Sequence, residues 1–252
     1  MDLSATTGKN TLNNKPQNKE RAAIAQMFDK IARRYDFLNH FFSLHIDRIW
    51  RHKAVNELRG ESLDEVLDVA TGTADLALAI QKRLRPGHVI GVDISEGMLA
   101  VGRQKVEKKG LGRQITVKYG DSEALPFADH TFDAVTVAFG VRNFEHLEKG
   151  LGEMFRVLKT GGKLVILEFS IPRNRIFRSV FNFYFLRILP FLGRLISKDT
   201  RAYHYLPDSV QSFPHGTEFK DKMENCGFKD VKVKPLSFGI ACIYTGKRFL
   251  ED

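Results

Sequence analysis

Short apolar runs alternate with amphipathic segments along most of the chain after residue 61. The runs predict strands at residues 65–69, 88–92, 115–119, 134–139 and 163–169. Between them, apolar residues recur at helical spacing and predict helices at residues 74–84, 96–108 and 147–158. Because strands that alternate with helices of this length form βαβ units, we predict an α/β fold with a doubly wound, mostly parallel sheet.

The end of the chain follows a different pattern. A predicted helix at residues 216–226 is followed by two strands, 231–235 and 240–247, with only a short Gly-containing segment between them. This close spacing predicts an antiparallel hairpin that completes a seven-stranded sheet. A mostly parallel sheet with this ending is typical of class I methyltransferases with a Rossmann-like fold, and not of all-parallel dinucleotide-binding folds.

The first 60 residues differ from the rest in composition. Residues 1–19 are rich in Asn, Lys, Thr and Gln and contain few large apolar side chains, so we predict a disordered arm. Apolar positions at helical spacing predict helices at residues 22–34 and 46–58. The predicted organisation is an arm (1–19), an N-terminal helical cap (20–60) and a methyltransferase domain (61–252) with an insertion at residues 171–210.

Composition narrows the location of the protein and the kinds of site it can hold. A chain of 252 residues with 43% hydrophobic residues can bury one substantial core. It has no apolar stretch of the length that a membrane span or a secretory signal needs, which favours a cytoplasmic protein. The two cysteines, Cys226 and Cys242, lie outside any CxxC or Cys/His cluster, so we expect neither a disulfide framework nor a metal site.

The formal net charge of +9 raises the alternative of a nucleic-acid-binding protein. Much of the excess positive charge lies in three places: between residues 33 and 51, at the lysines between residues 105 and 109, and at residues 173–201. In the third place arginines are interleaved with aromatic and aliphatic residues, which suits a membrane surface better than a phosphate backbone. We therefore expect no nucleic-acid partner.

Small and acidic residues follow the first predicted strand. The segment from Asp68 to Asp75 contains Gly72 and Thr73, and backbone amides at the start of the next helix can approach a ligand there. As a glycine fingerprint the segment is weak, because Ala70 and Ala74 occupy two of the usual glycine positions, and a capped tight turn is the alternative. Its acids oppose a pyrophosphate but suit a sulfonium and an ammonium group. They favour S-adenosylmethionine over a dinucleotide.

Two further polar segments follow successive strands. Asp93 comes at the end of the second strand, where a carboxylate can accept hydrogen bonds from both hydroxyls of a ribose. Asp121 and Ser122 follow the third strand and could contact an adenine edge, although a helix cap explains these two residues alone. Because open α/β sheets bind ligands at the carboxyl ends of their strands, the three segments together predict one cofactor site.

Five longer segments are specific enough to indicate a family. They are residues 27–36 (MFDKIARRYD), 47–51 (DRIWR), 123–127 (EALPF), 139–143 (FGVRN) and 167–170 (LEFS). On these segments the chain resembles the quinone-biosynthesis C-methyltransferases, the demethylmenaquinone and 2-methoxy-6-polyprenyl-benzoquinol methyltransferase family, from Met27 onward. The resemblance implies S-adenosylmethionine as cofactor. It also implies cofactor contacts at Thr73, Asp93, Asp121 and Ser122.

Methyl transfer to a ring carbon requires a quinol that has lost a hydroxyl proton, so the site needs phenolate stabilisation and a proton acceptor. The resemblance points to Arg142 and Asn143, which directly follow the fourth strand at the same sheet edge as the cofactor. Arg142 is expected to stabilise the phenolate as a permanent cation, and Asn143 to orient the quinol or a bridging water. A structural salt bridge of Arg142 and a helix cap by Asn143 are the alternatives. Five residues stay open as the proton acceptor: Tyr35, Asp36, His146, His204 and Tyr205.

Residues 173–201 allow several interpretations. Pro190 and the arginines argue against a simple transmembrane helix. A basic amphipathic element at the lipid interface and a lid over the substrate channel both fit a substrate that lives in the bilayer. A homodimer interface or an additional core helix are the alternatives. The protein is thus expected in the cytoplasm, with association at the inner face of the membrane as an option.

We predict C-methylation of demethylmenaquinol, a polyprenyl naphthoquinol, to menaquinol. C-methylation of the polyprenyl-benzoquinol precursor of ubiquinone is the nearest alternative, and the choice rests on the resemblance alone. A different class of alternative is a basic Rossmann-like protein that binds RNA or membrane without catalysis. Such a protein would show salt-sensitive nucleic-acid binding and no turnover, whereas the enzyme would bind S-adenosylmethionine stoichiometrically.

Overall fold

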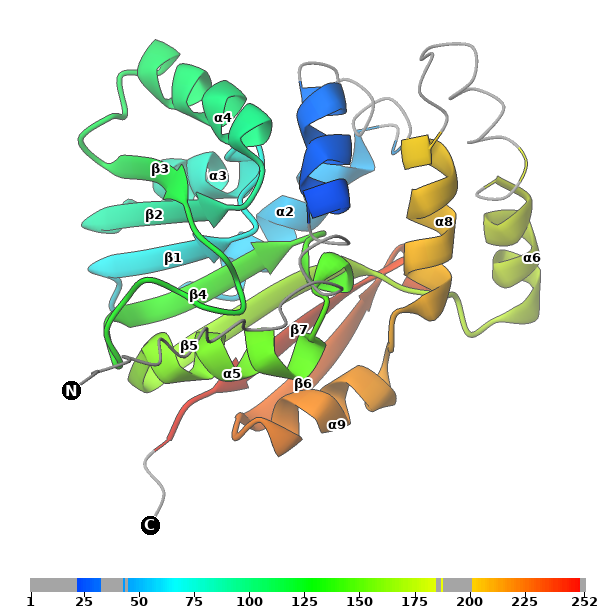
Figure 1. The fold of residues 1–252 in the computed structure, drawn as a ribbon. Coiled ribbons are helices and arrows are strands. Elements are labelled where there is room, and N and C mark those ends of the chain that lie inside the picture. Colours follow the sequence, from blue (N-terminus) through cyan, green and yellow to red (C-terminus); the bar gives the residue numbers. More distant parts are fainter. Residues whose placement is uncertain (1–21, 33–42, 44, 185–186, 188–200, 250–252) are drawn as a thin grey trace, which may run out of the picture.

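The computed structural model describes residues 22–32, 43, 45–184, 187 and 201–249. Within them, seven strands form one sheet in the order β3-β2-β1-β4-β5-β7-β6 (Figure 1). The strands are β1 (Glu65–Val69), β2 (His88–Asp93), β3 (Ile115–Tyr119), β4 (Phe132–Ala138), β5 (Leu158–Phe169), β6 (Lys229–Leu236) and β7 (Ala241–Lys247). β1 to β5 pair in parallel, and β7 lies antiparallel between β5 and β6. The predicted α/β class, the seven strands and the terminal antiparallel hairpin are confirmed.

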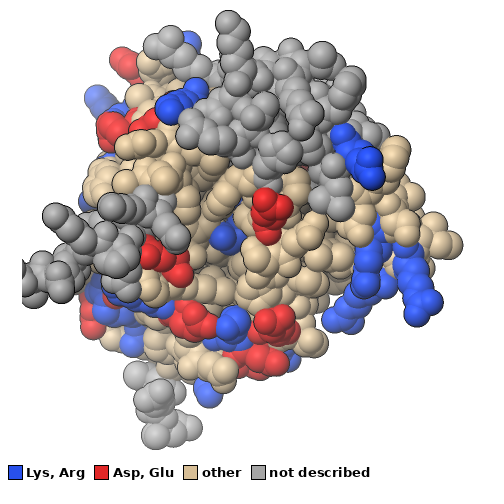
Figure 2. Space-filling model, turned by 45° about the vertical axis from the view of Figure 1, so that its right-hand side comes forward, with Lys and Arg blue, Asp and Glu red and all other residues tan. Residues whose placement is uncertain are grey.

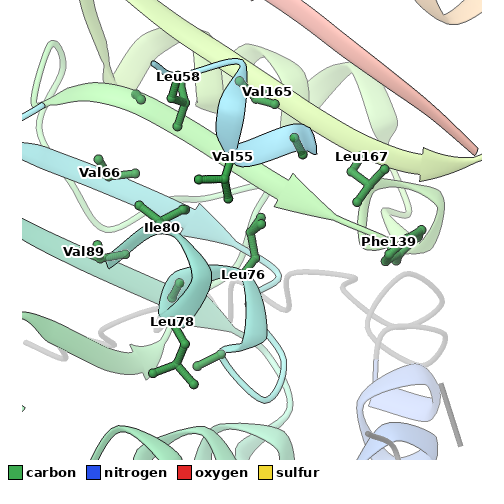
Figure 3. Packing of buried hydrophobic residues seen from close by; sticks show 14 of the residues in the cluster. Val55, Leu58, Val66, Leu76, Leu78, Ile80, Val89, Phe139, Val165 and Leu167 are labelled. Carbon is green, nitrogen blue, oxygen red and sulfur yellow. The ribbon is translucent and has the colours of Figure 1, made fainter. Parts of the chain in front are cut away.

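Helices cover both faces of the sheet. They are α2 (Ile46–Asn56), α3 (Asp75–Leu84), α4 (Glu96–Lys108), α5 (Leu147–Val157) and α9 (Thr217–Asn225). Successive side chains of a strand point to opposite faces, so Val66 of β1 packs in one core and Leu67 in the other. The first core contains residues of α2 and α3 (Figure 3) and of α4, and the second contains residues of α5 and α9. Because both faces are covered, the central strands appear in the sequence as nearly continuous apolar runs.

β5 is longer than the sequence pattern indicates. It begins at Leu158, not at residue 163, and continues through two glycines that resemble a turn in the sequence. Leu158 pairs with Phe132, and the register shifts before Ala134 pairs with Lys163. The extra residues therefore form an irregular extension of the β4–β5 ladder. Gly161 has a φ of 80°, which glycine adopts without strain, so the chain can pass through this irregularity.

Two helices from the predicted insertion stand beyond the carboxyl end of the sheet. They are α6 (Arg175–Phe183) and α8 (Arg201–Ser212), and α6 lies at the outside of the molecule (Figure 1). Most of the chain between them lies outside the described residues. Within the part of the chain that the structure describes, no helix has both the length and the apolar character that a membrane crossing needs.

Residues 22–32 form a helix that lies beside the start of α4 (Figure 1). Oδ1 of Asp29 accepts hydrogen bonds from Oγ of Ser95 (2.6 Å) and from the backbone N–H of Gly97 (2.8 Å). Gly97 allows this approach, because a Cβ atom there would lie 2.9 Å from the Cα of Asp29. The helix thus forms a wall at the carboxyl edge of the sheet. The predicted arm at 1–19 lies outside the described residues, and the proposed division into cap and domain stays a prediction.

Candidate active site

A cavity opens at the carboxyl ends of β1 to β4. Its walls come from the turns after these strands, from the short 3-10 helix η1 (Val141–Asn143), and from the N-terminal helix and α2. Figure 2 shows this face of the molecule hollowed, with charged side chains around the hollow. Of the predicted catalytic pair, Asn143 lines the cavity, whereas Arg142 is not part of its lining. All the predicted cofactor residues line it: Asp68, Gly72, Thr73, Asp93, Asp121 and Ser122.

Asp93 connects the ends of two strands. Its Oδ2 accepts a hydrogen bond from the backbone N–H of Gly72 (2.9 Å), and its Oδ1 accepts one from the backbone N–H of Ser95 (2.9 Å). Burial raises the pKa of Asp93, and these backbone hydrogen bonds oppose the rise. The two bonds fix the orientation of the carboxylate, while each oxygen keeps a further lone pair for a ligand. The arrangement suits a pair of adjacent hydroxyls.

The β1–α3 turn keeps the shape of a glycine-rich turn with only one glycine. Ala70, Gly72 and Ala74 have φ angles of 51°, 55° and 65°, all in the left-handed region. The positions at which the sequence departs from a glycine fingerprint are therefore positions at which glycine would be unstrained. The two alanines adopt the same conformation at a cost of about 1–2 kcal/mol each. The weak fingerprint thus conceals a turn with three consecutive alternate positions in the left-handed region.

Asp68 is buried beneath this turn, with 1% of its surface exposed. Its Oδ2 accepts a hydrogen bond from Oγ1 of Thr71 (2.6 Å), and its Oδ1 accepts one from Oγ1 of Thr136 (2.8 Å). Burial raises the pKa of Asp68 to about 6, and the hydroxyl groups and the nearby Arg51 oppose the rise. Near neutral pH this carboxylate places negative charge at the cavity, which suits a cationic ligand group.

Asp75, the second acid of the turn, is paired with a cation. Nζ of Lys105 lies 2.6 Å from Oδ1 of Asp75 and also donates a hydrogen bond to Oγ1 of Thr73 (3.0 Å). Lys105 therefore neutralises one of the two charges that the sequence suggested would oppose a pyrophosphate. The electrostatic preference for a phosphate-free ligand rests mainly on Asp68.

The turn after β3 forms part of the cavity wall. Oδ1 of Asp121 accepts a hydrogen bond from the backbone N–H of Glu123 (2.9 Å), the kind of local bond that a capping role predicts. Asp121 and Ser122 nevertheless line the cavity. Glu123 is buried, and its carboxylate pairs with Nδ1 of His146 (2.9 Å). The turn is thereby tied to the segment that follows η1.

Arg142 forms a buried ion pair. Its Nη1 donates hydrogen bonds to Oε1 of Glu168 (2.8 Å) and to the carbonyl oxygen of Phe139, and its guanidinium lies over the ring of Phe169. Glu168 is fully buried. Nε of Arg142 is also buried, and it has no hydrogen-bond partner among the described residues. The salt bridge that the sequence left as an alternative is thus present, and one N–H group remains to be satisfied.

Asn143 is held by a residue from the insertion. The hydroxyl of Tyr205 in α8 donates a hydrogen bond to Oδ1 of Asn143 (3.0 Å). Burial raises the pKa of Tyr205, while the charge of Arg142 opposes the rise. Oδ1 keeps a second lone pair, and the amide of Asn143 also carries the two N–H donors of Nδ2. The helix that follows is α5, and its N-cap residue is His146, so Asn143 does not cap it.

Two of the five candidates for the proton acceptor are described with their side chains. His146 is paired with Glu123 and is not part of the cavity lining, and Tyr205 is a hydrogen-bond donor to Asn143. Tyr35 and Asp36 lie outside the described residues, as does the side chain of His204. Neither of the two described candidates therefore lines the cavity.

Three residues of the site were not singled out by the sequence. Arg51 lines the cavity, Glu168 pairs with Arg142, and Asp29 anchors the N-terminal helix. Each lies inside a segment that carried the family resemblance. The spacing of Asp47 and Arg51, four residues apart on one helix, was a signal for an ion pair that could have been used.

A family model for the ubiE/COQ5 methyltransferase family matches residues 15–248, which is most of the chain. The chain belongs to this family. A relative from Bacteroides fragilis named "Demethylmenaquinone methyltransferase" is 49% identical over 230 residues, covering 91% of this chain and 94% of the relative. A relative from Geobacter sulfurreducens named "Ubiquinone/menaquinone biosynthesis C-methyltransferase UbiE" is 51% identical, covering 90% of this chain and 89% of the relative.

Membership of the ubiE/COQ5 family confirms the prediction of an S-adenosylmethionine-dependent methyltransferase. Solved structures agree on the fold. A SAM-dependent methyltransferase from Aquifex aeolicus has a TM-score of 0.56 at 21% identity and covers 78% of this chain and 88% of its own. The [4+2]-cyclase SpnF has a TM-score of 0.66 at 14% identity, covering 92% and 97%. A cyclase among these structures shows that the fold alone does not determine the reaction.

Proposed function

We propose that this protein transfers the methyl group of S-adenosylmethionine to a ring carbon of demethylmenaquinol and so forms menaquinol. The observation that carries the proposal is the cavity that combines Asp93 and the acidic turn with the Asn143–Tyr205 pair. Relatives named demethylmenaquinone methyltransferase, at 44–49% identity, support the naphthoquinol as acceptor. The ubiquinone precursor is the second candidate, because other relatives of similar identity are named for both pathways.

The donor half of the cavity fits the cofactor group by group. S-adenosylmethionine supplies a methyl group on a positively charged sulfur. Asp93 would accept hydrogen bonds from the two ribose hydroxyls, and Asp121 and Ser122 would face the adenine. The negative charge of Asp68 would favour the positive groups of the ligand. Thr73 and Gly72 would contribute lining and backbone polar groups at the start of α3.

The acceptor half offers hydrogen-bond donors to a phenolate. Nδ2 of Asn143 would donate to the quinol oxygen as that oxygen loses its proton, which stabilises the developing negative charge. Nε of Arg142 is buried without a partner among the described residues, and because Arg142 does not line the cavity, a bridging water would have to link it to that oxygen. Because Glu168 balances the charge of Arg142, we assign Arg142 the role of an oriented donor more than that of a free cation.

Product analysis tests this function directly. Purified protein is incubated with labelled S-adenosylmethionine and either reduced demethylmenaquinone or the reduced benzoquinol precursor, and the products are identified by mass. We expect one methyl group on the naphthoquinol ring. Methylation of the benzoquinol alone would favour the second candidate. If neither quinol is methylated and the protein instead binds RNA in a salt-sensitive manner, the enzymatic function is wrong.

We also propose that α6 contacts the cytoplasmic face of a membrane. Four large apolar side chains of this nine-residue helix are exposed, at spacings that place them on one side: Ile176, Phe177, Val180 and Phe183. Phe177 stacks on the exposed Phe238, which extends the apolar surface. Arg175 and Arg178 lie on the same helix and would meet anionic lipid headgroups. Figure 2 shows basic side chains extending on the right of the molecule beside largely uncharged surface.

Vesicle co-sedimentation separates this contact from a homodimer interface. The double variant Ile176→Ser/Val180→Ser should bind vesicles with 30% anionic lipid, a composition chosen for the assay, about tenfold more weakly than the wild type. A control variant, Ile49→Ser, removes an exposed apolar side chain of α2 and should bind as the wild type does. If the double variant binds vesicles as the wild type does, the membrane contact is wrong. If the wild type is a dimer and the double variant is a monomer, α6 belongs to the dimer interface.

A further inference from the structure

One charged group of the methyl donor is not matched by the acidic residues that line the donor half of the cavity. The amino-acid end of S-adenosylmethionine carries an ammonium group and a carboxylate. Acidic lining residues such as Asp68 suit the ammonium but oppose the carboxylate. A carboxylate that leaves water needs a cation or several N–H donors to replace its hydration. The cavity should therefore contain such a group.

Among the described residues, Arg51 is the one Lys or Arg side chain that lines the cavity. It projects from α2 and is 8% exposed. It shares the cavity lining with Gly72 of the β1–α3 turn and with Phe139 at the end of β4. Two other cations lie nearby in the fold, but Lys105 pairs with Asp75 and Arg142 pairs with Glu168, and neither lines the cavity.

The guanidinium of Arg51 is held in place from two sides. Its Nη1 donates a hydrogen bond to Oδ2 of Asp47, one helical turn earlier, and Oγ of Ser43 donates to the other oxygen of Asp47 (2.7 Å). The guanidinium carbon lies 5.4 Å from the ring centre of Phe139. A guanidinium has five N–H donors in a planar fork, and the hydrogen bond to Asp47 engages Nη1. Donors therefore remain for a second carboxylate.

The charges around Arg51 match the amino-acid end of the ligand. The positive charge of Arg51 reaches Asp68, where it opposes the rise in the pKa of that carboxyl group. A ligand that carries an ammonium and a carboxylate on one carbon could place the first toward Asp68 and the second toward Arg51. From this arrangement we infer that Arg51 binds the carboxylate of S-adenosylmethionine, with Asp47 as the residue that positions it. The inference rests on the proposed function, because it assumes that methyl donor.

A pair of ligands that differ only in the carboxylate tests the inference without turnover. Isothermal titration calorimetry at fixed ionic strength compares S-adenosylmethionine with decarboxylated S-adenosylmethionine on the full-length protein. The wild type should bind the decarboxylated ligand roughly tenfold to a hundredfold more weakly. Arg51→Met should weaken S-adenosylmethionine by a similar factor and should bind the two ligands within about threefold of each other. Arg51→Lys should keep part of the discrimination.

The control is Arg83→Met, which removes an exposed arginine of α3 that bonds Asn56 away from the cavity. This variant should discriminate between the ligands as the wild type does. The inference is overturned if the wild type binds both ligands equally, or if Arg51→Met keeps the wild-type ratio. Should Arg51→Met lack a cooperative thermal transition, Arg51→Gln takes its place, and a wild-type ratio in that neutral variant overturns the inference. A wild type that binds neither ligand would refute the proposed function itself.

Discussion

The two halves of the proposed site, the donor half around Asp93 and the acceptor half around Asn143, are built in different ways. In the donor half, main-chain N–H groups hold the key carboxylate, as Gly72 and Ser95 do for Asp93. In the acceptor half, side chains from separate elements hold one another, as Glu168 does for Arg142 and Tyr205 for Asn143. Main-chain geometry survives most substitutions, whereas a side-chain pair is lost with either member. The same fold can therefore keep its donor site while its acceptor site changes.

The largest expected effect concerns the ion pair of the acceptor half. Glu168→Ala leaves the guanidinium of Arg142 buried without its carboxylate, so the free energy of unfolding should fall by about 3–5 kcal/mol. Urea denaturation measures the change. The control Lys234→Ala removes one member of an exposed pair with Glu57 and should cost less than about 1 kcal/mol. Similar losses in the two variants would contradict the importance of burial at Glu168.

The next effect concerns the buried acid of the donor half. The pKa of Asp68 rises on folding from 3.8 to about 6, so between these values the folded protein binds more protons than the unfolded chain. The contribution of Asp68 to the free energy of unfolding therefore falls as the pH rises from about 4 to 6. Asp68→Asn removes the titration and should gain up to about 3 kcal/mol relative to the wild type between pH 4 and pH 7. Urea denaturation at both values tests this, and a pH-independent difference would contradict the raised pKa.

A third effect measures how far the donor half depends on one side chain. Asp93→Ala leaves the ribose hydroxyls without their acceptor and should weaken S-adenosylmethionine binding by about 1–3 kcal/mol. Calorimetric titration of the folded variant gives the affinity. Asp129→Ala, which removes an exposed acid paired with Arg156, serves as control and should bind as the wild type does. Unchanged affinity in Asp93→Ala would remove this residue from the site.

The donor half could be predicted from the sequence because its parts are local. Each strand, its turn and the following helix are consecutive, so Asp68, Asp93 and Asp121 could be assigned to strand ends from hydrophobic periodicity alone. The left-handed backbone at Ala70 and Ala74 could not, since alanine rarely adopts it and gives no signal for it.

The acceptor half could be predicted only in part, because its contacts join distant segments. Asn143 and Tyr205 are 62 positions apart, and the resemblance identified the first without its partner. Glu168 lies one residue before the end of β5, and charged residues are usually exposed, so its complete burial gave no sign in the sequence. Pairing of this kind becomes visible only when the elements are placed in space.

The smallest expected effect decides the role of Tyr205. Tyr205→Phe removes the donor to Oδ1 of Asn143. It should lower kcat/KM for the quinol roughly twofold to tenfold, which corresponds to a loss of about 0.5–1.5 kcal/mol of transition-state stabilisation. The affinity for S-adenosylmethionine should not change. The control Tyr119→Phe alters an exposed ring and should match the wild type. A proton acceptor contributes about a hundredfold or more. A loss of that size in Tyr205→Phe would identify this tyrosine as the base. The acceptor half, which side chains alone hold together, would then carry out proton transfer as well as orient the quinol.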